Sequence, residues 1–567
     1  MLTTLTAPAF AGTWYIEDGD ITISAGESGN NVTQNENTTE NDPDTIITNR
    51  EEGASSHTVT IDAKDKDDKV EVTLKDVNID TSKQSKAAVS VTGKGDTTIE
   101  LDGDNELQGG DKHAGLEHNQ TVDSEGNVTS GKLTIQDDND NAGSLTATGG
   151  YFGAGIGGGS AKAGQVTITG GTITAISGDG AGIGGGQGNM GSNAGNADIE
   201  ISGGTIEATG GYTSAGIGGG YYGDATIKIT GDAVIKNAAG GFFGAGIGGG
   251  GGGNGDITIS GNAKIENAQG GYAGSGIGGG YGASGTVAIK DDSTVTATGG
   301  EVGAGIGGGV GGLADITIEG NATVNATGGV GSAGIGGGAD AENDEDDGNG
   351  NQISIKSNES GAPTVNATGG VSDVDNAGET IPGGAGIGSG VGDATAEITI
   401  EGKVTIVAKA GESNAAIGDM NGEQVFTGLD GSITRYDSEG NDTTLPTDPG
   451  YPVPADTSSS GGGSAGASVQ ESVFPGLIVT DKDGQRISYT SIRGNNVLSL
   501  RVGRFTASLH ASLSTLRQLR AEGIDTITFQ TILCSTTLSV DELLAMGGED
   551  AEAVLTHRLT ASSLTVG

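Results

Sequence analysis

The chain has 567 residues, of which 113 are glycine and only 3% are aromatic, and its formal net charge is −47. So few aromatic side chains cannot fill an ordinary globular core of this length, and the glycines lack the strict every-third spacing of collagen. The negative charge argues against binding to nucleic acid phosphates or anionic lipid headgroups, and no apolar run reaches the roughly 18 residues needed for membrane insertion.

The first residues have the features of the end of a secretory signal peptide. Residues 1–11 finish with Ala9-Phe10-Ala11, which fits the small-x-small cleavage rule after a short apolar stretch. An ordinary N-terminal segment is the alternative, because the basic residues that begin such a peptide are missing. The single cysteine, Cys534, excludes an internal disulfide and is compatible with a Gram-positive exterior. These features predict a secreted or cell-surface protein.

Residues 12–132 are predicted to form an N-terminal cap and the first turns of a coil of strands. Apolar and polar residues alternate over short stretches between residues 57 and 110, and this alternation is typical of strands. Trp14 and Tyr15 are expected near a cap that shields the open end of the coil from pairing with another chain.

Residues 133–449 contain a glycine-rich repeat. The heptapeptide GAGIGGG at residues 153–159 recurs at spacings of 27 to 34 residues, with one spacing of 52. A phosphate-binding glycine loop occurs once and carries a Lys, so this repeated motif is not one. The isoleucine of the motif falls at Ile156, Ile183, Ile217, Ile247, Ile277, Ile306, Ile335 and Ile387, with a degenerate copy at Ile417.

Each repeat of about 30 residues holds three short alternating segments, as in residues 314–338. We therefore predict an all-β fold, a right-handed parallel β-helix with three strands per turn, in which equivalent residues lie about 4.8 Å apart along the axis. In the heptapeptide only Ile is expected to point inward, while glycines turn the backbone with positive φ. One predicted ladder of inward residues comprises Ile168, Ile201, Ile229, Ile259, Ile289, Ile318 and Ile400.

Three phrases in the first part of the chain resemble a known family. They are DDKVEVTLKDVNI (Asp67–Ile79), AAVSV (Ala87–Val91) and TTIELDGDNELQGG (Thr97–Gly110). They look like the clostridial-type carbohydrate-binding domain family of secreted and cell-surface Gram-positive proteins. The resemblance implies a right-handed parallel β-helix similar in shape to pectate lyases, and binding of plant polysaccharides. It implies no particular site residues.

The end of the chain has a different composition. Residues 450–469 form a linker rich in Pro, Ser and Gly, and residues 470–567 are predicted to be a small α/β module. Leu509, Leu513 and Leu516 have helical spacing within residues 507–523, and Gly523 is placed to end that helix. This module could dock a cell-wall or protein partner, or cap the coil.

Aromatic residues recur at two places in the repeat, one just after the second strand and one just after the heptapeptide. If the turns align, they form a strip on which sugar rings can pack; the alternative is mutual stacking that stiffens a corner. The candidate carbohydrate-binding residues are Tyr151, Phe152, Tyr212, Phe242, Phe243 and Tyr272 at the first place, and Tyr221, Tyr222 and Tyr281 at the second.

Catalysis is not expected. A lyase on such a scaffold needs a basic group beside bound Ca²⁺, and the sequence has no arginine between Arg50 and Arg435. Ca²⁺ is the one cofactor that the residues suggest, because Asp344 and Asp346 alternate in an acidic insertion; a solvated acidic loop is the alternative.

The sequence as a whole predicts non-catalytic polysaccharide binding by a secreted or cell-surface β-helix. The alternative is a structural adhesin or spacer, whose coil projects the C-terminal module toward a protein partner.

Overall fold

In the computed structural model the chain forms two compact units, residues 1–438 with 447–450, and residues 439–446 with 451–567. The structure describes the chain apart from residues 1–11, 140, 189–194, 344–349, 375–379, 393, 420–421, 424–430, 446–447, 451–476, 482–485, 488, 495, 503–505, 532–534, 547–551, 559–560 and 567. The expected signal peptide and all but the first residue of the expected linker lie outside the described residues.

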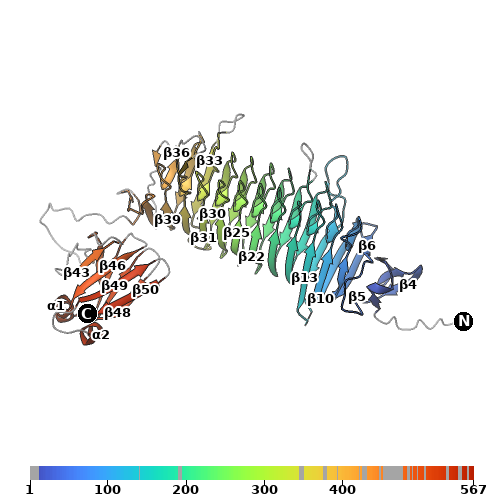
Figure 1. The fold of residues 1–567 in the computed structure, drawn as a ribbon, viewed down its shortest axis with the longest axis horizontal. Helices are drawn as coiled ribbons and strands as arrows, with labels where there is room; N and C mark the ends of the chain where they lie inside the picture. The colour runs from blue at the N-terminus through green and yellow to red at the C-terminus, as the bar shows by residue number, and fades with distance from the viewer. Residues whose placement is uncertain are drawn as a thin grey trace. The chain divides into compact units, whose positions relative to one another are not determined.

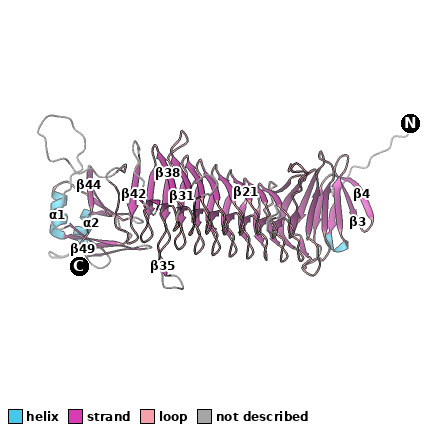
Figure 2. Ribbon diagram, turned by 90° about the horizontal axis from the view of Figure 1, so that it is seen from above, coloured by secondary structure: helices cyan, strands magenta, loops and turns pink. Residues whose placement is uncertain are grey.

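The first unit is a coil of short parallel strands with three faces (Figure 1 and Figure 2). Over the described residues, two faces join through the long strand β10 (Asp96–Gln108) into one 24-stranded sheet, and the third face is a 16-stranded sheet. Within the repeat, strands pair in parallel with the equivalent strand of the next turn, in register except after Ile206 and Ile265, where an irregularity shifts the register. This arrangement confirms the predicted parallel β-helix.

The strands of the coil repeat from turn to turn with similar bounds. The first face comprises β1 (Thr13–Tyr15), β5 (Thr45–Thr48), β7 (Lys69–Lys75), the first part of β10, β12 (Leu133–Gln136), β15 (Gly164–Ile168), β18 (Ala197–Ile201), β21 (Ala225–Ile229), β24 (Gly255–Ile259), β27 (Gly285–Ile289), β30 (Ala314–Glu319), β33 (Asn351–Lys356) and β38 (Ala396–Glu401). The second comprises β8 (Asn78–Asp80), the rest of β10, β13 (Gly143–Thr148), β16 (Thr172–Ile176), β19 (Thr205–Thr209), β22 (Val234–Ala239), β25 (Lys264–Gln269), β28 (Thr294–Thr298), β31 (Thr323–Thr327), β34 (Thr364–Thr368), β39 (Thr405–Lys409) and β42 (Ser432–Tyr436). The third comprises β2 (Ile21–Ala25), β6 (Val59–Ala63), β9 (Val89–Gly93), β11 (Leu116–His118), β14 (Ile156–Gly157), β17 (Ile183–Gly184), β20 (Ile217–Gly218), β23 (Ile247–Gly248), β26 (Ile277–Gly278), β29 (Ile306–Gly307), β32 (Ile335–Gly336), β37 (Ile387–Gly388) and β40 (Ile417–Asp419).

The isoleucine of the glycine heptapeptide forms an inward ladder on the third face. Ile217 pairs with Ile247, which pairs with Ile277, and all three side chains are fully buried. The next residue, Gly218, has φ +139°, and a Cβ there would lie 1.9 Å from the carbonyl oxygen of Gly248. Any larger residue would push neighbouring turns apart, which explains why the strand carries one side chain. Each buried Ile contributes about 1.5–3 kcal/mol, so the ladder is stable where a single turn is not.

The isoleucine ladder of the first face contains a turn that the sequence reading missed. Ile318 pairs with Ile355 of β33, and Ile355 pairs with Ile400, so the predicted ladder omitted one member. Ile335 and Ile387, which are 52 residues apart, pair directly with each other. The long spacing is therefore a single turn that carries insertions, and those insertions hid its strands from a search based on period.

The N-terminal end of the coil is covered by antiparallel strands. β3 (Asn30–Gln34) pairs antiparallel with β2, and β4 (Asn37–Asp42) pairs antiparallel with β3. Trp14 packs against the core there, and its indole nitrogen donates a hydrogen bond of 2.9 Å to the carboxylate of Asp42. These strands occupy the end of the third face, where an open edge would invite pairing with another chain.

At the other end of the coil, an arginine side chain takes a place in the core. Arg435 on β42 pairs with Ala408, so it continues a column that holds alanine in the turns before it. The fully buried guanidinium makes two hydrogen bonds, 2.7 and 2.9 Å long, to the carboxylate of Asp448. It also donates to the carbonyl oxygen of Ile417, so the last turn is closed by a paired charge.

The second unit has its own core, built from two sheets and two short helices in the described residues. The helix predicted within residues 507–523 begins later than expected. Residues 507–512 form a strand, because A-S-L-H-A-S alternates with period two, and Leu509 is buried from that strand. Ser512 caps the helix by accepting a hydrogen bond of 3.2 Å from the backbone of Thr515, and Gly523 follows it with φ +85°. The elements are β43 (Leu477–Thr480), β44 (Thr490–Gly494), β45 (Val497–Arg501), β46 (Ala507–Ser512), α1 (Leu513–Ala521), β47 (Thr526–Gln530), β48 (Ser535–Ser539), α2 (Val540–Met546), β49 (Glu552–Arg558) and β50 (Ala561–Val566).

Neither helix in the described part of the chain is long and apolar enough to cross a membrane.

Candidate carbohydrate-binding surface

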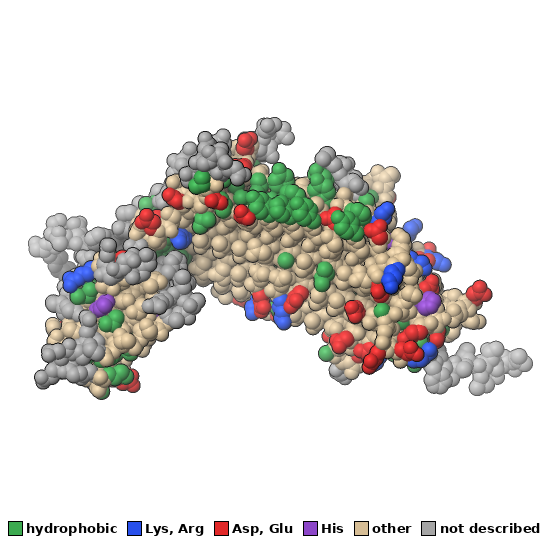
Figure 3. Space-filling model, in the orientation of Figure 1, with side chains coloured by type: hydrophobic (Ala, Val, Ile, Leu, Met, Phe, Trp, Pro, Cys, Tyr) green, Lys and Arg blue, Asp and Glu red, His purple; other side chains and the backbone are tan. Residues whose placement is uncertain are grey.

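Two rows of aromatic side chains lie along the coil, where Figure 3 shows hydrophobic side chains gathered along one edge. Each row collects residues from equivalent positions of successive turns, one just before the heptapeptide strand and one just after it. We call them the pre-heptad row and the post-heptad row. The pre-heptad row is Tyr151, Phe152, Tyr212, Phe242, Phe243 and Tyr272; the post-heptad row is Tyr221, Tyr222 and Tyr281.

Three rings of the pre-heptad row stack face to face. Tyr212 and Phe242 have ring centroids 5.3 Å apart and planes 15° from parallel. Phe242 and Tyr272 are 4.7 Å apart and 6° from parallel. Because one turn of the coil separates each ring from the next, Phe242 is covered on both faces, and Tyr212 and Tyr272 are each stacked on one face. This geometry is the mutual stacking considered as an alternative in the sequence reading.

Tyr151 does not join that stack. Its described ring partner is Phe152, at 4.6 Å in an edge-on arrangement, and its side chain is 61% exposed. The turn between Tyr151 and Tyr212 carries Asp179 instead of an aromatic residue. The strip predicted from the sequence is therefore interrupted after its first pair.

Asp179 is a buried carboxyl group in this row. It accepts a hydrogen bond of 3.3 Å from the Thr213 hydroxyl and another from the amide of Gln187. Burial raises the pKa of Asp179 above its usual range, while the hydrogen bonds from Thr213 and Gln187 oppose the rise. The charged carboxylate is thus held in the coil at some cost in free energy.

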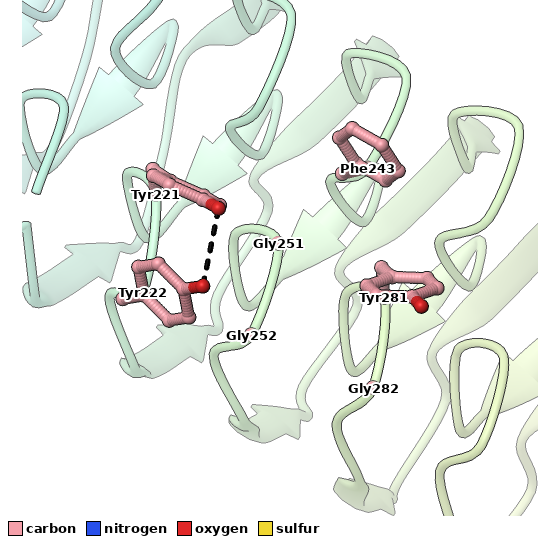
Figure 4. Close-up of a pocket in the computed structure, with 7 residues that line it drawn as sticks. All are labelled: Tyr221, Tyr222, Phe243, Gly251, Gly252, Tyr281 and Gly282. Carbon is pink, nitrogen blue, oxygen red and sulfur yellow. Dashed lines mark hydrogen bonds between the residues drawn. The ribbon is translucent and has the colours of Figure 1, made fainter. Parts of the chain in front are cut away.

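The post-heptad row has a gap that forms a pocket (Figure 4). Tyr221 and Tyr222 stand on one turn, Gly251 and Gly252 occupy the equivalent positions of the next, and Tyr281 stands on the turn after that. The missing side chains leave a pocket of about 360 Å³, near the lower end of the range of about 300–1,000 Å³ for small-ligand sites. Its lining residues are Tyr221, Tyr222, Phe243, Gly251, Gly252, Tyr281 and Gly282.

Backbone hydrogen bonds between turns fix the floor of the pocket. The N–H of Tyr222 donates to the carbonyl oxygen of Gly251, and the N–H of Gly252 donates to that of Tyr281, both at 2.8 Å. The N–H of Gly251 donates to the carbonyl oxygen of Thr213, also at 2.8 Å. The pocket is therefore preformed, which lowers the entropy lost when a ligand binds.

Tyr222 has an unusual backbone conformation for a bulky residue. Its φ is +54°, whereas the equivalent positions of the next turns hold Gly252 at +80° and Gly282 at +70°. A non-glycine residue in this region is strained by about 1–3 kcal/mol, and such strain often marks functional sites. Its ring leans over the floor, since a Cβ on Gly252 would lie 2.5 Å from the ring carbon Cδ1 of Tyr222.

Ring contacts and one hydroxyl contact hold the walls of the pocket. The ring centroid of Phe243 lies 5.3 Å from that of Tyr281 and 4.9 Å from that of Phe242. Phe243 therefore connects the pocket to the stacked rings. Tyr221 donates a hydrogen bond of 3.1 Å to the hydroxyl of Tyr222. That hydrogen bond, together with burial, raises the pKa of Tyr221.

A row of polar side chains at the same corner was missed in the sequence reading. The side-chain oxygen of Asp224 accepts from the backbone N–H of Asn254 at 2.7 Å, and that of Asn254 accepts from Ser284 at 2.9 Å. Each of these residues follows the heptapeptide isoleucine by seven positions, and that constant spacing could have revealed the row. These three hydrogen-bonding residues each come two positions after a residue that lines the pocket, namely Tyr222, Gly252 or Gly282.

The structure does not test the predicted Ca²⁺ site. Asp344 and Asp346, the expected Ca²⁺ ligands, lie outside the described residues. Among the residues that the structure does describe, no group of three or more His, Cys, Asp or Glu side chains is arranged to hold a metal ion. Ca²⁺ binding by the acidic insertion stays a prediction from the sequence.

Five segments of the coil match a protein family described as Beta helix repeat. The matched residues are 141–160, 166–187, 199–221, 287–310 and 316–339. No curated protein and no solved structure matches the chain. The match supports a parallel β-helix family, in agreement with the strand pairing. It does not include residues 67–110, which carry the resemblance to carbohydrate-binding domains.

Proposed function

We propose that the coil binds a polysaccharide without catalysis, through the pocket in the post-heptad row. The observation that carries the proposal is a preformed pocket of about 360 Å³ with aromatic walls and a glycine floor. Sugar rings have apolar C–H faces that pack on aromatic rings, and neighbouring polar groups can bind their hydroxyls. The stacked pre-heptad rings support the wall of the pocket, because Tyr212 and Phe242 both contact Phe243.

The lining of the pocket favours binding over catalysis. Hydrolysis of a glycosidic bond uses two carboxyl groups roughly 5–10 Å apart across the bond. The described residues that line this pocket are Tyr, Phe and Gly, and carry neither a carboxylate nor an imidazole. A ligand held there would meet apolar contacts and hydroxyl groups.

The same proposal places the protein outside the cell, secreted or on the cell surface. It rests on the acidic composition, the lone cysteine and the signal-like residues 1–11. A net charge of −47 favours solubility and disfavours nucleic acid as a partner. A glycan of a cell wall, outside the cell, is the partner that fits these features.

Retention of the full-length protein on insoluble polysaccharides tests the proposal. We expect the double substitution Tyr222→Ala with Tyr281→Ala to weaken binding by a factor of about 5 to 150, because loss of two ring contacts of about 0.5–1.5 kcal/mol each removes about 1–3 kcal/mol. The matched control is Tyr151→Ala with Tyr272→Ala, which removes two exposed rings of the pre-heptad row whose ring contacts, with Phe152 and Phe242, do not involve the pocket lining.

Two outcomes would contradict the proposal. Absence of retention on any polysaccharide would refute the function. Retention that the pocket substitution leaves unchanged, and that the control substitution abolishes, would move the site to the pre-heptad row.

A structural role is the second candidate. The C-terminal residues form a separate compact unit with its own core, so the coil could serve as a spacer that presents this unit to a protein. Deleting residues 470–567 separates the two roles: polysaccharide retention survives the deletion if the coil binds, whereas adhesion to a protein partner is lost if the module docks.

A further inference from the structure

We infer that two copies of this chain pair with each other through β50, edge to edge and antiparallel. The inference concerns the second compact unit and goes beyond glycan binding by the coil. It follows from an edge strand that carries none of the features that prevent such pairing, and from an apolar side chain on that strand that is only partly covered.

The outer edge of β50 is open. β50 is the outermost strand of a four-stranded sheet in the order β43, β46, β49, β50 (Figure 1). At the opposite edge, the backbone N–H of Ile487 donates a hydrogen bond of 2.9 Å to the carbonyl oxygen of Val479, so β43 is covered. Within the described part of the chain, neither a strand nor a hydrogen bond covers the outer edge of β50. Because an antiparallel edge strand bonds its neighbour through alternate residues, about half of its N–H and C=O groups stay available for another strand.

β50 also lacks the devices that block open edges. Natural proteins place charges, proline or a bulge on such strands. The coil does so at its N-terminal end, where the edge strand β4 carries Glu40 and Asp42 and its register with β3 shifts. The sequence of β50 is ASSLTV, without charge or proline, and its six residues pair with β49 in unbroken register. A further strand therefore meets no obstacle on β50.

The core-facing side of β50 is incompletely covered. Leu564 lies opposite Leu555, and Val566 lies opposite Ala553; both partners on β49 are buried. Leu564 itself is 36% exposed, although it is on the same face of the sheet as those buried residues. A neighbouring strand with an apolar residue on this face would cover Leu564 and stabilise the pair.

A second copy of the chain supplies such a strand. Residues opposite each other in an antiparallel pair point to the same face, so a two-fold axis perpendicular to the sheet joins the two core-facing sides. When the pair is centred on Leu564, this residue stands opposite its own copy, and Ser563 stands opposite Thr565. Apolar residues then meet apolar residues, and no charge is brought into the contact.

The distribution of charge favours the same contact. Residues 471–567 contain 8 Lys and Arg against 10 Asp and Glu, so this segment carries only about −2 of the net charge of −47. The rest of the chain is strongly negative, and two coils repel each other. Contact between copies is therefore least opposed by electrostatic repulsion in the second unit.

The molar mass of the full-length protein tests the inference. Light scattering after size exclusion should show a mass that rises toward that of two chains as the concentration rises, and added salt should strengthen the dimer by screening the coils. Ser563→Lys with Thr565→Lys changes two exposed residues and places lysine opposite lysine in the pair. We expect this variant to raise the dissociation constant of the dimer at least about tenfold.

The edge strand of the other sheet provides the control. β48 is also uncharged, but its apolar residue Leu538 packs against the core. Thr537→Lys changes an exposed residue of β48 and should alter the dissociation constant less than about twofold. A dimer that Thr537→Lys disrupts and that the β50 variant leaves intact would overturn the assignment to β50.

A charge swap separates loss of pairing from loss of folding. Ser563→Glu with Thr565→Glu should also be monomeric alone, whereas an equimolar mixture of the lysine and glutamate variants should form a dimer, because lysine then stands opposite glutamate. A mixture that stays monomeric would contradict the antiparallel pairing of β50. A native protein that has the mass of one chain at every concentration and salt would overturn the inference altogether.

Discussion

The ring of Phe242 stacks on the ring of Tyr272 at 4.7 Å and within 6° of parallel, although the two residues are 30 positions apart in the chain. Such a contact forms only if each repeat lays its residues directly above those of the repeat before it. The same alignment creates the pocket, since the glycines of one turn leave an interval of two turns between the equivalent residues Tyr221 and Tyr281. The spacing of the coil thus decides which aromatic rings touch each other and which can hold a ligand.

The stacked rings are expected to stabilise the coil. Phe242→Ala removes three ring contacts, to Tyr212, Tyr272 and Phe243, and should lower the free energy of unfolding by about 1–3 kcal/mol. Tyr151→Ala, the matched control, removes a ring that is 61% exposed and should change stability by less than about 1 kcal/mol. Thermal unfolding followed by circular dichroism measures both; equal effects would show that the stack contributes nothing.

Tyr222 is expected to serve binding rather than stability. Tyr222→Asn loses the ring contact with Tyr221 at 4.1 Å but relieves the backbone strain at φ +54°. The two effects oppose each other, so the free energy of unfolding should change by less than about 1 kcal/mol while glycan affinity falls about tenfold. Calorimetric titration beside a denaturation curve checks this. A loss of stability of several kcal/mol would mean that Tyr222 is a structural residue.

Asp179 is expected to make stability depend on pH. Because burial raises the pKa of Asp179, the folded state holds its proton more tightly than the unfolded state does. The ionised carboxylate therefore costs stability at neutral pH, and stability rises as the pH falls through the raised pKa of the folded state. Asp179→Asn keeps a hydrogen-bond acceptor for Thr213 and removes the charge, so it should raise the melting temperature at neutral pH.

The gain from Asp179→Asn should shrink as the pH is lowered through the raised pKa, since the native carboxyl group is then neutral too. The exposed Asp256, changed to Asn, is the control and should show no such pattern. A variant that is less stable than the native protein at neutral pH would contradict the raised pKa.

The buried pair at the C-terminal end of the coil gives a fourth prediction. Arg435→Ala leaves the buried carboxylate of Asp448 without its principal cation, and should destabilise the last turns by about 3–5 kcal/mol. Replacing both residues together, Arg435→Met with Asp448→Leu, removes both charges and should cost much less. Hydrogen exchange over residues 405–436 measures the effect. An equal loss in the single and double variants would show that the ion pair does not close the coil.

The alternation of apolar residues and the recurring heptapeptide were enough to predict the strands, the inward isoleucines and the parallel coil. These features are local: side chains on a strand alternate between two faces, and identical repeats stack in register. Where insertions interrupted the period of about 30 residues, the predicted ladder of isoleucines was incomplete: it omitted Ile355, which lies in the 52-residue turn. Leu509 was placed on a helix because its spacing to Leu513 suits one, although its own segment alternates like a strand.

The nine candidate aromatic residues were identifiable from the sequence, but their separation into a stack and a pocket was not. That separation depends on what the neighbouring turns carry: rings one turn apart cover each other, as Tyr212 and Phe242 do, whereas Gly251 and Gly252 leave space between rings two turns apart. Likewise Arg435 reads as an isolated basic residue in the sequence, and only the pairing of β42 with β39 places it in the core beside Asp448. The local alternation of apolar and polar residues determined which side chains point inward. Whether an outward ring stacks or lines a pocket was decided by contacts between turns, because those contacts join residues that are distant in the sequence.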